Sequence, residues 1–402
     1  MEEISVQRLN WRRWPTLAPT WERIHNMCPD ASFFVSREWV GCWLSTFGED
    51  LNPDLLTFVR GGDVVGCCLL VWRTVWVGGI PLRRAYLNCA GENEADKTYI
   101  EYNSLLCCPD CGECVARALA SFLKKRRWDE LMLPGVVDQE AIRVLADALG
   151  ESEVSETPAR YVAFTPLREE RRDYLDMLSA KTRYHIRRTQ RSFEEIGGTC
   201  TVHQAQSADE ALGMLRQLAE LHQARWKARG AAGCFSSAKF THFHSALIQQ
   251  HFNRVMLFRV QAGPEIVGFL YCFLYEGWVY HYQSGFCYSL DSRRSPGLLT
   301  LYYVIGACLA REELKGFDFM AGDTEYKRSL TADSGHKPLR WFVVRRRTVP
   351  SLLYLLLRGL KRKYFKTTEK SRQQVQRPNG NEPGEGVSVS TNEVLRTDNR
   401  GN

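Results

Sequence analysis

Two stretches of the chain share one pattern of hydrophobic and polar positions. Residues 54–72 (DLLTFVRGGDVVGCCLLVW) contain two apolar runs around a Gly-Gly-Asp turn, and residues 255–274 (VMLFRVQAGPEIVGFLYCFL) contain two such runs around Ala-Gly-Pro-Glu. Runs of Val, Leu and Phe on both sides of a glycine-bearing turn predict a β-hairpin. A Val-Gly dipeptide at 65–66 and again at 267–268 aligns the two hairpins.

Each predicted hairpin is followed by further elements in the same order. In the first copy a helical pattern at 116–127 leads into an apolar strand at 128–135, and in the second a helical pattern at 299–315 leads into a strand at 316–322. A repeated order of elements predicts two domains of one fold. The fold class is therefore α+β, with two domains that each form a mixed, mainly antiparallel sheet flanked by helices, and each ends in a helix crossover to a parallel strand.

We place the first domain at 1–165 and the second at 166–349. The two copies differ most just before their crossover helix. There the first copy carries the long segment 90–114, and the second carries the short basic turn 292–297 (SRRSPG). If only one copy retains a cofactor loop, we expect it to be the second.

The turn at 292–297 joins a predicted strand, 278–287, to a helix. A helix N-terminus offers unpaired N–H groups and a partial positive charge, so a pyrophosphate can bind there. Proline suits the first helical turn, and glycine allows close approach of the backbone. The alternative is an ordinary helix start. The candidate cofactor-binding residues are Arg293, Arg294, Ser295, Gly297 and Leu298.

A basic helix is predicted between the two copies, over 175–198, with Ser179 as a candidate N-cap. Its arginines recur at i, i+4 and i+8 and so share one face, which is either a solvated surface or an anchor for an anionic substrate. A second helix over 208–229 brings Trp226 close to a turn. The candidate substrate-binding residues are Arg183, Arg187 and Trp226.

The segment 350–366 (PSLLYLLLRGLKRKYFK) is an apolar run followed by basic residues. Such an amphipathic helix either docks on the parent domain or makes a peripheral contact with an anionic membrane through 352–366. The polar segment 367–402 has almost no aromatic residues and predicts a disordered tail.

Charge and composition indicate the kind of ligand and the cellular location of the protein. The chain has 402 residues and a net charge of +7, which suits a phosphate-bearing ligand; we expect no DNA partner. Residues 1–17 lack the apolar core of a signal peptide, and the longest apolar runs, such as 64–72, are about half as long as a membrane-spanning helix. We therefore expect a cytoplasmic protein, with membrane association through its basic helix as an addition.

Fourteen cysteines without a secretion signal predict reduced thiols. The run Cys107-Cys108-Pro-Asp-Cys111-Gly-Glu-Cys114 has a spacing that occurs in metal sites, but a structural zinc site usually needs a second ligand pair, and the sequence has no second C-x2-C or H-x3-H pair. We favour a loop followed by a helix with Asp110 as its N-cap, and no bound metal. The metal alternative stays open at this point.

Several motifs of the second half together resemble the GCN5-related N-acetyltransferase (GNAT) superfamily, specifically its CelD/BcsL-like, cellulose-biosynthesis-type acetyltransferases, which are related to the Fem-type aminoacyltransferases. The tandem arrangement of the two copies is similar to the Fem-type layout. The matching stretches are Lys181-Thr-Arg-Tyr-His-Ile-Arg-Arg, His222-Gln-Ala-Arg-Trp-Lys-Ala-Arg-Gly, Ser295-Pro-Gly-Leu-Leu and Phe317-Asp-Phe-Met-Ala-Gly-Asp-Thr-Glu-Tyr-Lys.

The resemblance implies that acetyl-CoA or another acyl-CoA is the donor. The superfamily binds the donor's pyrophosphate with a loop of pattern [QR]-x-x-G-x-[GA]. Arg294 and Gly297 match its first two fixed positions, and Leu299 departs from the third. Fem-type relatives use aminoacyl-tRNA, so the departure at Leu299 leaves aminoacyl-tRNA as an alternative donor.

The chemistry implied is attack of an acceptor amine on a thioester. A lysine-like amine has a pKa of about 10.4, so holding it neutral at pH 7 costs roughly 4 to 5 kcal/mol unless a base or a desolvating pocket helps. Candidates near the ends of the strands are His281, Asp318, Asp323, Glu325 and Tyr326. The resemblance implies that Tyr326 and Lys327 lie in the active site, where Lys327 would pair with a phosphate or the developing oxyanion. The candidate catalytic residues are Asp323, Tyr326, Lys327 and His281.

Three functions are consistent with these observations. The first is an acyl-CoA-dependent N-acyltransferase that acts on a small molecule or a glycan precursor, such as an amino sugar for a cell-surface polysaccharide. The second is Fem-type transfer of an amino acid from tRNA to a wall precursor. The third is a non-catalytic accessory protein of polysaccharide biosynthesis that docks through its C-terminal helix.

Overall fold

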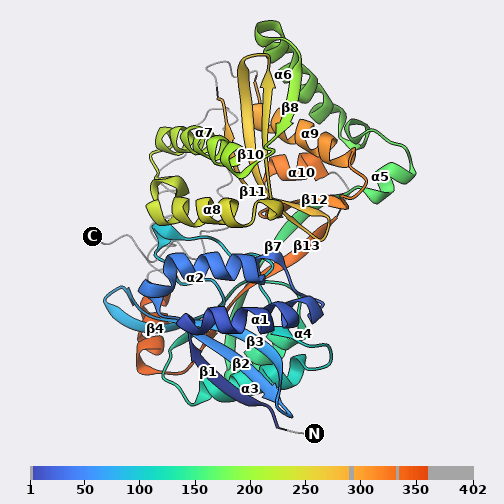
Figure 1. Cartoon of the computed structure of the whole chain (residues 1–402). Coiled ribbons are helices and arrows are strands. Elements are labelled where there is room, and N and C mark those ends of the chain that lie inside the picture. The colour runs from blue at the N-terminus through green and yellow to red at the C-terminus, as the bar shows by residue number, and fades with distance from the viewer. Residues whose placement is uncertain (1–2, 289–293, 332–334, 361–402) are drawn as a thin grey trace.

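In the described part of the chain, one β-sheet of thirteen strands runs through both halves of the molecule (Figure 1). The computed structural model describes residues 3–288, 294–331 and 335–360. The strand order is β1-β2-β3-β4-β6-β13-β7-β12-β11-β10-β9-β8, and the short β5 pairs with β3. The strands of the first half are β1 (Ser5–Asn10), β2 (Asp54–Arg60), β3 (Asp63–Val77), β4 (Ile80–Leu87), β5 (Leu106–Cys107), β6 (Glu130–Val136) and β7 (Glu151–Ala163). Those of the second half are β8 (Cys200–Gln204), β9 (Val255–Ala262), β10 (Glu265–Tyr275), β11 (Trp278–Phe286), β12 (Gly316–Ala321) and β13 (His336–Arg345).

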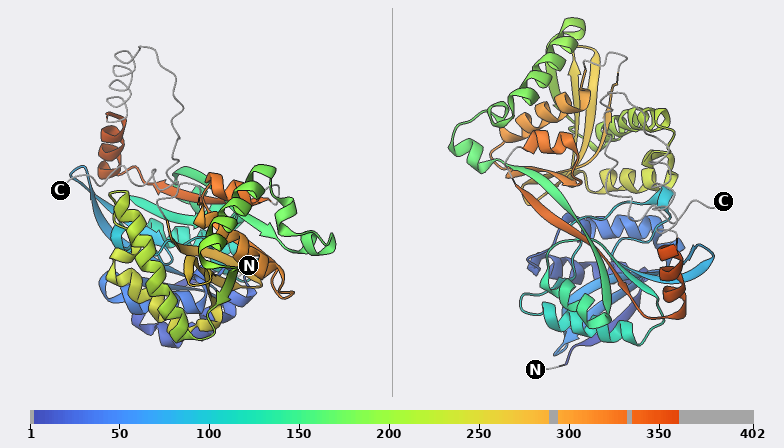
Figure 2. Two further views of the ribbon diagram at one scale, coloured as in Figure 1. Left: turned by 90° about the horizontal axis from the view of Figure 1, so that it is seen from above. Right: turned by 180° about the vertical axis from the view of Figure 1, so that it is seen from behind.

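Helices flank both halves of the sheet (Figures 1 and 2). The first half has α1 (Trp14–Met27), α2 (Arg37–Leu51), α3 (Gly112–Lys124) and α4 (Glu140–Leu149). The second half has α5 (Thr165–Glu169), α6 (Ala180–Gly197), α7 (Ala208–Ala228), α8 (Ala238–Gln250), α9 (Pro296–Leu309) and α10 (Glu325–Thr331). Residues 349–360 form a further helix after β13.

The repeated order of elements is present in the structure. The hairpin β2–β3 corresponds to β9–β10, and the crossover helix α3 corresponds to α9. In both copies the crossover leads to a parallel pair, β4 with β6 and β11 with β12, whereas the remaining pairings of named strands are antiparallel. The predicted α+β class, with two mixed and mainly antiparallel parts, is confirmed.

The two copies exchange their last strands, which the sequence did not predict. Strand β7 leaves the first half and pairs with β12 of the second, while β13 leaves the second half and pairs with β6 of the first. The two exchanged strands pair with each other along their length, and so they join the halves into one sheet. The boundary that we place at 165 stays a prediction, because β7 precedes it in the chain but lies beside β12.

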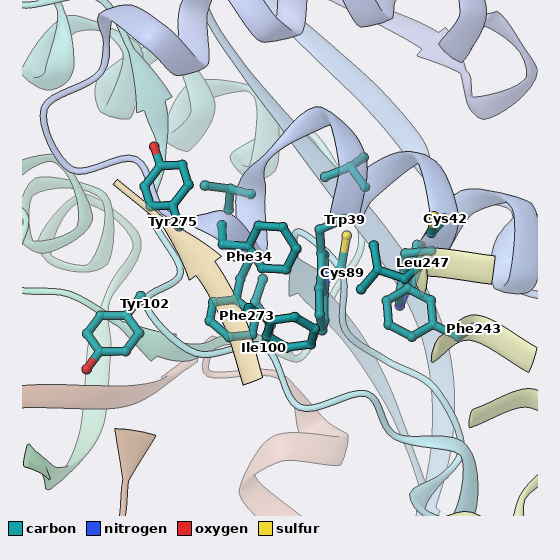
Figure 3. Close-up of a cluster of buried hydrophobic side chains, with 14 of the residues drawn as sticks. Phe34, Trp39, Cys42, Cys89, Ile100, Tyr102, Phe243, Leu247, Phe273 and Tyr275 are labelled. Carbon is teal, nitrogen blue, oxygen red and sulfur yellow. The ribbon is translucent and has the colours of Figure 1, made fainter. Parts of the chain in front are cut away.

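A buried cluster of aromatic side chains packs the two halves together (Figure 3). Trp39 of α2 lies with its ring centroid 4.8 Å from that of Phe243 of α8 and 5.5 Å from that of Phe273 of β10. Phe34, which precedes α2, lies 6.0 Å from Phe273. These side chains are almost fully buried, so the contact between the halves has the character of a domain core.

Two predicted helix starts have different outcomes. Ser179 is the N-cap of α6, since its Oγ accepts a hydrogen bond from the N–H of Thr182 at 3.1 Å, and this prediction is confirmed. Asp110 is not the N-cap of α3, so that prediction was wrong. The cap position is held by Cys111, and Asp110, one residue earlier, has a φ of +61° in the left-handed region.

The C-terminal part of the described chain holds a helix on the edge of the first half (Figure 2). The predicted basic helix over 350–366 and tail over 367–402 extend past residue 360, so those parts of both predictions lie outside the described residues. Among the described helices, none combines the length and the apolar character that crossing a bilayer requires.

Candidate active site

A cleft of about 680 Å³ opens between the two halves where β11 and β12 separate. The two strands pair in register only from Trp278 to Tyr280, opposite Gly316 to Asp318. Beyond that point, residues 281–284 of β11 and 319–322 at the end of β12 line opposite sides of the cleft. The divergence of two parallel strands therefore creates the opening.

The other wall of the cleft comes from the first half. The loop after β4, which is part of the long segment 90–114, lines the cleft with several side chains, among them Glu92, Glu94, Lys97 and Glu101. The loop is closed at its base by Asn88, whose side-chain amide donates to Asn103 Oδ1 at 2.6 Å and to the Ser104 carbonyl at 2.8 Å. The Tyr282 hydroxyl of β11 donates to the Thr98 carbonyl of the loop. The segment that distinguishes the first copy is thus a structural wall of the second copy's cleft.

Glu101 of this loop projects a carboxylate into the cleft. Its Oε2 accepts a hydrogen bond from the N–H of Ala321, at the end of β12, at 2.7 Å. Burial raises the pKa of Glu101 to about 7, although the hydrogen bond from Ala321 and the positive charge of Lys327 both act to lower it. A carboxylate that titrates near pH 7 has the proton affinity that a general base requires.

Lys327 of α10 faces Glu101 across the backbone of Ala321. It is 7% exposed, and its Nζ donates to the carbonyl oxygens of Ala321 at 2.6 Å and Met320 at 3.2 Å. Burial lowers the pKa of Lys327 to about 8, and the charges of Glu101 and Asp318 oppose this shift. An ammonium group has three donors, so one N–H remains beyond the two that bind these carbonyls.

A buried carboxylate fixes the end of β12. Asp318 is 1% exposed, and burial raises its pKa above the ordinary value. Its Oδ2 accepts from the Tyr102 hydroxyl at 2.5 Å, and its Oδ1 accepts from the N–H of Met320 at 2.6 Å. Met320 has a φ of +59°, in the left-handed region, and the register of β12 against β7 shifts at this point. Asp318 therefore shapes the bulge that aims Ala321 at both Glu101 and Lys327.

The cleft brings together four residues that the sequence singled out: His281, Trp226, Tyr326 and Lys327. His281 is 8% exposed, and burial together with the charge of Lys327 lowers its pKa to about 3. Its Nε2 has no hydrogen-bond partner within the described part of the chain. The indole Nε1 of Trp226 donates to His222 Nε2 at 2.9 Å, which holds both rings at the α7 side of the cleft.

Asp323 lies at the rim and is engaged in ion pairs. Its carboxylate pairs with Arg160 at 2.8 Å and with Arg328 at 2.9 Å. Burial acts to raise the pKa of Asp323, but the hydrogen bond and charge of Arg160, with Arg328, hold it below its ordinary value. A carboxylate held ionised by two arginines is a poor proton acceptor, whereas Glu101 has the opposite shift.

The candidate cofactor residues lie at the N-terminus of α9, beyond the cleft lining. Arg294 donates from Nε to Ser192 Oγ at 2.9 Å, and the N–H of Ser295 donates to Thr189 Oγ1 at 3.2 Å, so the start of α9 is tied to α6. Leu298 packs on the core of the second half, and Arg293 lies outside the described residues. Leu299, the position that departs from the superfamily pattern, is fully buried in that core. Its side chain therefore does not crowd a ligand at the helix start.

Gly297 lets the ring of Phe286 pack closely against the start of α9. A Cβ on Gly297 would lie 3.0 Å from the ring of Phe286, the last residue of β11. Because Pro296 has no N–H, Gly297 and Leu298 supply the first free amide groups of α9. The end of β11 therefore connects the cleft to a helix N-terminus with the donors that a pyrophosphate needs.

The basic face of α6 does not contribute to the cleft lining. Arg183 donates from Nη1 to the Leu178 carbonyl at 2.6 Å, and Arg187 is exposed. The cysteine run is also apart from the cleft: Cys107 and Cys111 are buried in the core of the first half. Within the described residues, no group of three or more His, Cys, Asp or Glu side chains is arranged to hold a metal ion.

The comparisons agree with this geometry. Residues 180–328 match the family model for the acetyltransferase (GNAT) domain. This part of the chain is similar to a GNAT acetyltransferase domain, and the similarity supports an acyltransferase. The match covers the cleft side formed by α7, β11, β12 and α10, and it also covers the N-terminus of α9. No curated protein matches the chain.

Solved structures share the fold at low sequence identity. The crystal structure of FemX has a TM-score of 0.54 and 12% identity, and the match covers 84% of this chain and 98% of FemX. A conserved protein of unknown function from Bacteroides thetaiotaomicron has a TM-score of 0.51 and 11% identity, with 85% of this chain and all of that chain covered. A tandem GNAT protein from the clavulanic acid biosynthesis pathway has a TM-score of 0.44 and 13% identity, with coverages of 85% and 98%. The likeness to FemX over most of both chains, together with the repeated order of elements, confirms the predicted fold class.

Sequence reasoning did not select Glu101. The long segment 90–114 is the main sequence difference between the copies, but no motif marks its acidic residues as catalytic. The available signal was the segment itself, AGENEADKTYIEYN, which carries three glutamates in a position where the second copy has only a short turn.

Proposed function

We propose that the protein is an acyl-CoA-dependent N-acyltransferase of the cellulose-biosynthesis type, which transfers an acetyl or related group to an amine of an amino sugar or another cell-surface polysaccharide precursor. The observation that carries this proposal is the pair of Glu101 and Lys327 on the two sides of Ala321, in a cleft formed by the diverging strands β11 and β12. One group accepts a proton near neutral pH, and the other supplies positive charge.

Glu101 acts as the general base. The acceptor amine binds in the cleft as an ammonium ion, and a Glu101 carboxylate oxygen takes its proton. With a pKa near 7, Glu101 is partly ionised at neutral pH and strong enough to lower the cost of making the neutral amine. The hydrogen bond from Ala321 holds the carboxylate in place while the amine approaches.

Lys327 stabilises the negative charge that develops on the thioester. The neutral amine nitrogen attacks the carbonyl carbon, a C–N bond forms, and the carbonyl oxygen becomes negative. The third N–H of Lys327 is assigned to this oxygen or to the departing sulfur. The C–S bond then breaks, the remaining extra proton of the amine nitrogen passes to the departing sulfur, and coenzyme A leaves as the thiol.

The donor is assigned to a path from the start of α9 to the cleft. The pyrophosphate is assigned to the amide groups of Gly297 and Leu298, and the acyl end is assigned to the gap between β11 and β12. Burial of Leu299 in the core supports this path, because the departure from the superfamily pattern takes no space from the ligand.

The acceptor side of the cleft suits a cationic and sugar-like molecule. Glu92, Glu94 and Glu101 line the cleft with Lys97, which pairs with Glu94 at 3.5 Å, and Trp226 supplies an aromatic face. Carboxylates attract an ammonium group, and an aromatic ring packs on the apolar face of a sugar ring. This combination supports an amino sugar as the acceptor.

The fold likeness to FemX favours a second candidate, Fem-type transfer of an amino acid from aminoacyl-tRNA to a wall precursor. The two candidates share the cleft and the base but differ in the donor.

The test is a reaction with a defined donor and acceptor. The purified full chain is incubated with acetyl-CoA and glucosamine, and then with a panel of amino-sugar nucleotides, and the amide product is detected by mass spectrometry. The proposal expects an acetylated amine that forms only when protein, donor and amine are all present. Product formation from aminoacyl-tRNA, with none from any acyl-CoA, would establish the second candidate instead.

A further inference from the structure

A second hollow, of about 610 Å³, lies on the first half of the molecule and is separate from the cleft in its lining. It is formed by the end of α3, the residues before β6 and the residues after β13. Most of its lining side chains are cationic, and Asp129 is the acidic residue among them. The cationic residues are Arg83, Lys124, Lys125, Arg126, Arg127, Arg346 and Arg347.

The charge of this cationic hollow is only partly neutralised. Asp129 is 1% exposed, and its carboxylate already accepts from the N–H of Arg83 at 2.8 Å and from Thr348 Oγ1 at 2.6 Å. Lys124, Lys125 and Arg127 are exposed, and none of them forms an ion pair with a described residue. The hollow thus presents uncompensated positive charge to solvent.

An apolar surface adjoins the cationic hollow. The helix at 349–360 contacts the first half through Tyr354, which packs on Val77 and Leu82 of the β3–β4 hairpin. Arg358 on the same side of the helix pairs with Glu153 at 2.6 Å. The other side of the helix is exposed. Its large apolar side chains are Val349, Leu352, Leu353, Leu355, Leu356, Leu357 and Leu360, of which Leu356 is 65% exposed.

The hollow and the leucine surface are continuous along the chain. Arg346, Arg347, Thr348 and Pro350 line the hollow, and the exposed leucines begin two residues later. Figure 2 shows this helix at the edge of the first half, beside the β3–β4 hairpin and away from the α6 end of the molecule.

We propose that the leucine surface and the cationic hollow together dock the protein on an anionic lipid bilayer. Exposed leucines on one side of a helix insert into the boundary between headgroups and acyl chains, and adjacent lysines and arginines bind the anionic headgroups. Charge complementarity favours an anionic bilayer as the partner. A bilayer has a negative headgroup surface for the cations of the hollow and an apolar interior for the leucines. The helix lies parallel to the membrane in this arrangement and does not span it.

Vesicle co-sedimentation with the full chain tests this proposal. The probes are vesicles of phosphatidylcholine alone and of phosphatidylcholine mixed with phosphatidylglycerol. Two double variants change the surface: Lys124→Glu with Lys125→Glu, and Leu352→Glu with Leu356→Glu. Matched controls elsewhere are Arg117→Glu, an exposed cation of α3, and Ile196→Glu, a 60% exposed residue of α6. Circular dichroism and the melting temperature confirm that each variant folds.

The expected result is binding to the anionic vesicles and little binding to phosphatidylcholine alone. The lysine pair should lose at least about tenfold in affinity, because each basic residue near an anionic surface contributes to binding. The leucine pair should lose about a hundredfold, because two exposed apolar side chains that would insert into the bilayer are replaced by carboxylates. Both controls should bind like the parent chain, and added salt should weaken binding.

Four results would overturn the proposal. They are an absence of binding to anionic vesicles, equal binding to both kinds of vesicle, retained affinity in either double variant, and self-association of the chain that the leucine pair abolishes without any vesicle binding. The last result would assign the leucine surface to a second copy of the protein.

Discussion

The substitution Glu101→Gln removes the proposed general base while it keeps nearly the same side-chain shape. Glutamine keeps an oxygen that accepts the N–H of Ala321, so the loop geometry should persist. It cannot take a proton from the acceptor amine. A general base typically contributes about 10²- to 10⁴-fold in rate, so kcat should fall by about that factor, with a smaller effect on acetyl-CoA binding.

The same substitution, which should lower kcat, should raise the stability of the folded protein. Raising the pKa of Glu101 from 4.5 to about 7 makes its ionised form about 3 kcal/mol less stable in the folded protein than in the unfolded chain. In the folded protein Glu101 keeps its proton up to about pH 7, whereas in the unfolded chain it loses the proton near pH 4.5. The unfolding free energy of the parent protein therefore falls by about 3 kcal/mol as the pH rises from about 4.5 to above 7. Glutamine does not titrate. The Gln variant should therefore gain up to about 3 kcal/mol relative to the parent between pH 4.5 and pH 8.

Two assays check these expectations together. Acetylation of the amine is followed against pH by mass spectrometry, and urea unfolding is followed at pH 4.5 and pH 8. The parent's kcat/KM should rise with pH through about 7, and this limb should be absent in Glu101→Gln. Glu113→Gln, an exposed carboxylate on α3, is the matched control. A variant that keeps its rate and the limb near pH 7 would refute the assignment of Glu101 as the base.

Three further substitutions test other parts of the account. Lys327→Met should lower kcat by about 10²-fold or more and remove the fall in activity above pH 8, because Lys327 has a pKa of about 8; an unchanged alkaline limb would contradict its role. Gly297→Val should weaken acetyl-CoA binding by about tenfold in calorimetry, since its Cβ would press on Phe286 and displace the start of α9; equal affinity would move the pyrophosphate elsewhere. Ser179→Ala should cost about 1 kcal/mol of unfolding free energy through the lost cap of α6, with kcat unchanged, and a loss below a few tenths would show that the cap bond contributes little.

Much of the fold was predictable because the two copies carry strong local patterns. Glycine-bearing turns between apolar runs predict the hairpins at 54–72 and 255–274, and the crossover helices follow at similar positions. The exchange of β7 and β13 was not predictable in this way. A strand pattern indicates that a segment pairs, but the choice of partner depends on contacts far apart in sequence.

The candidate site was predictable in part for a similar reason. Tyr326 and Lys327 follow a strand that a family motif marks, and the structure places both in the cleft. Glu101 lies more than 200 residues earlier, and only the folded loop brings it to Ala321. Its raised pKa comes from burial, which no local pattern at Glu101 encodes. Arg294 shows the reverse case, because its basic character indicated a phosphate ligand while its side chain binds Ser192.

Calorimetric titration of the full chain with acetyl-CoA tests the central claim most directly. Acyl-CoA-dependent transfer from this cleft predicts saturable binding at one site per chain, competition by free coenzyme A, and weaker binding by Gly297→Val. The absence of any heat of binding at millimolar acetyl-CoA, and equally with longer acyl-CoAs, would contradict it.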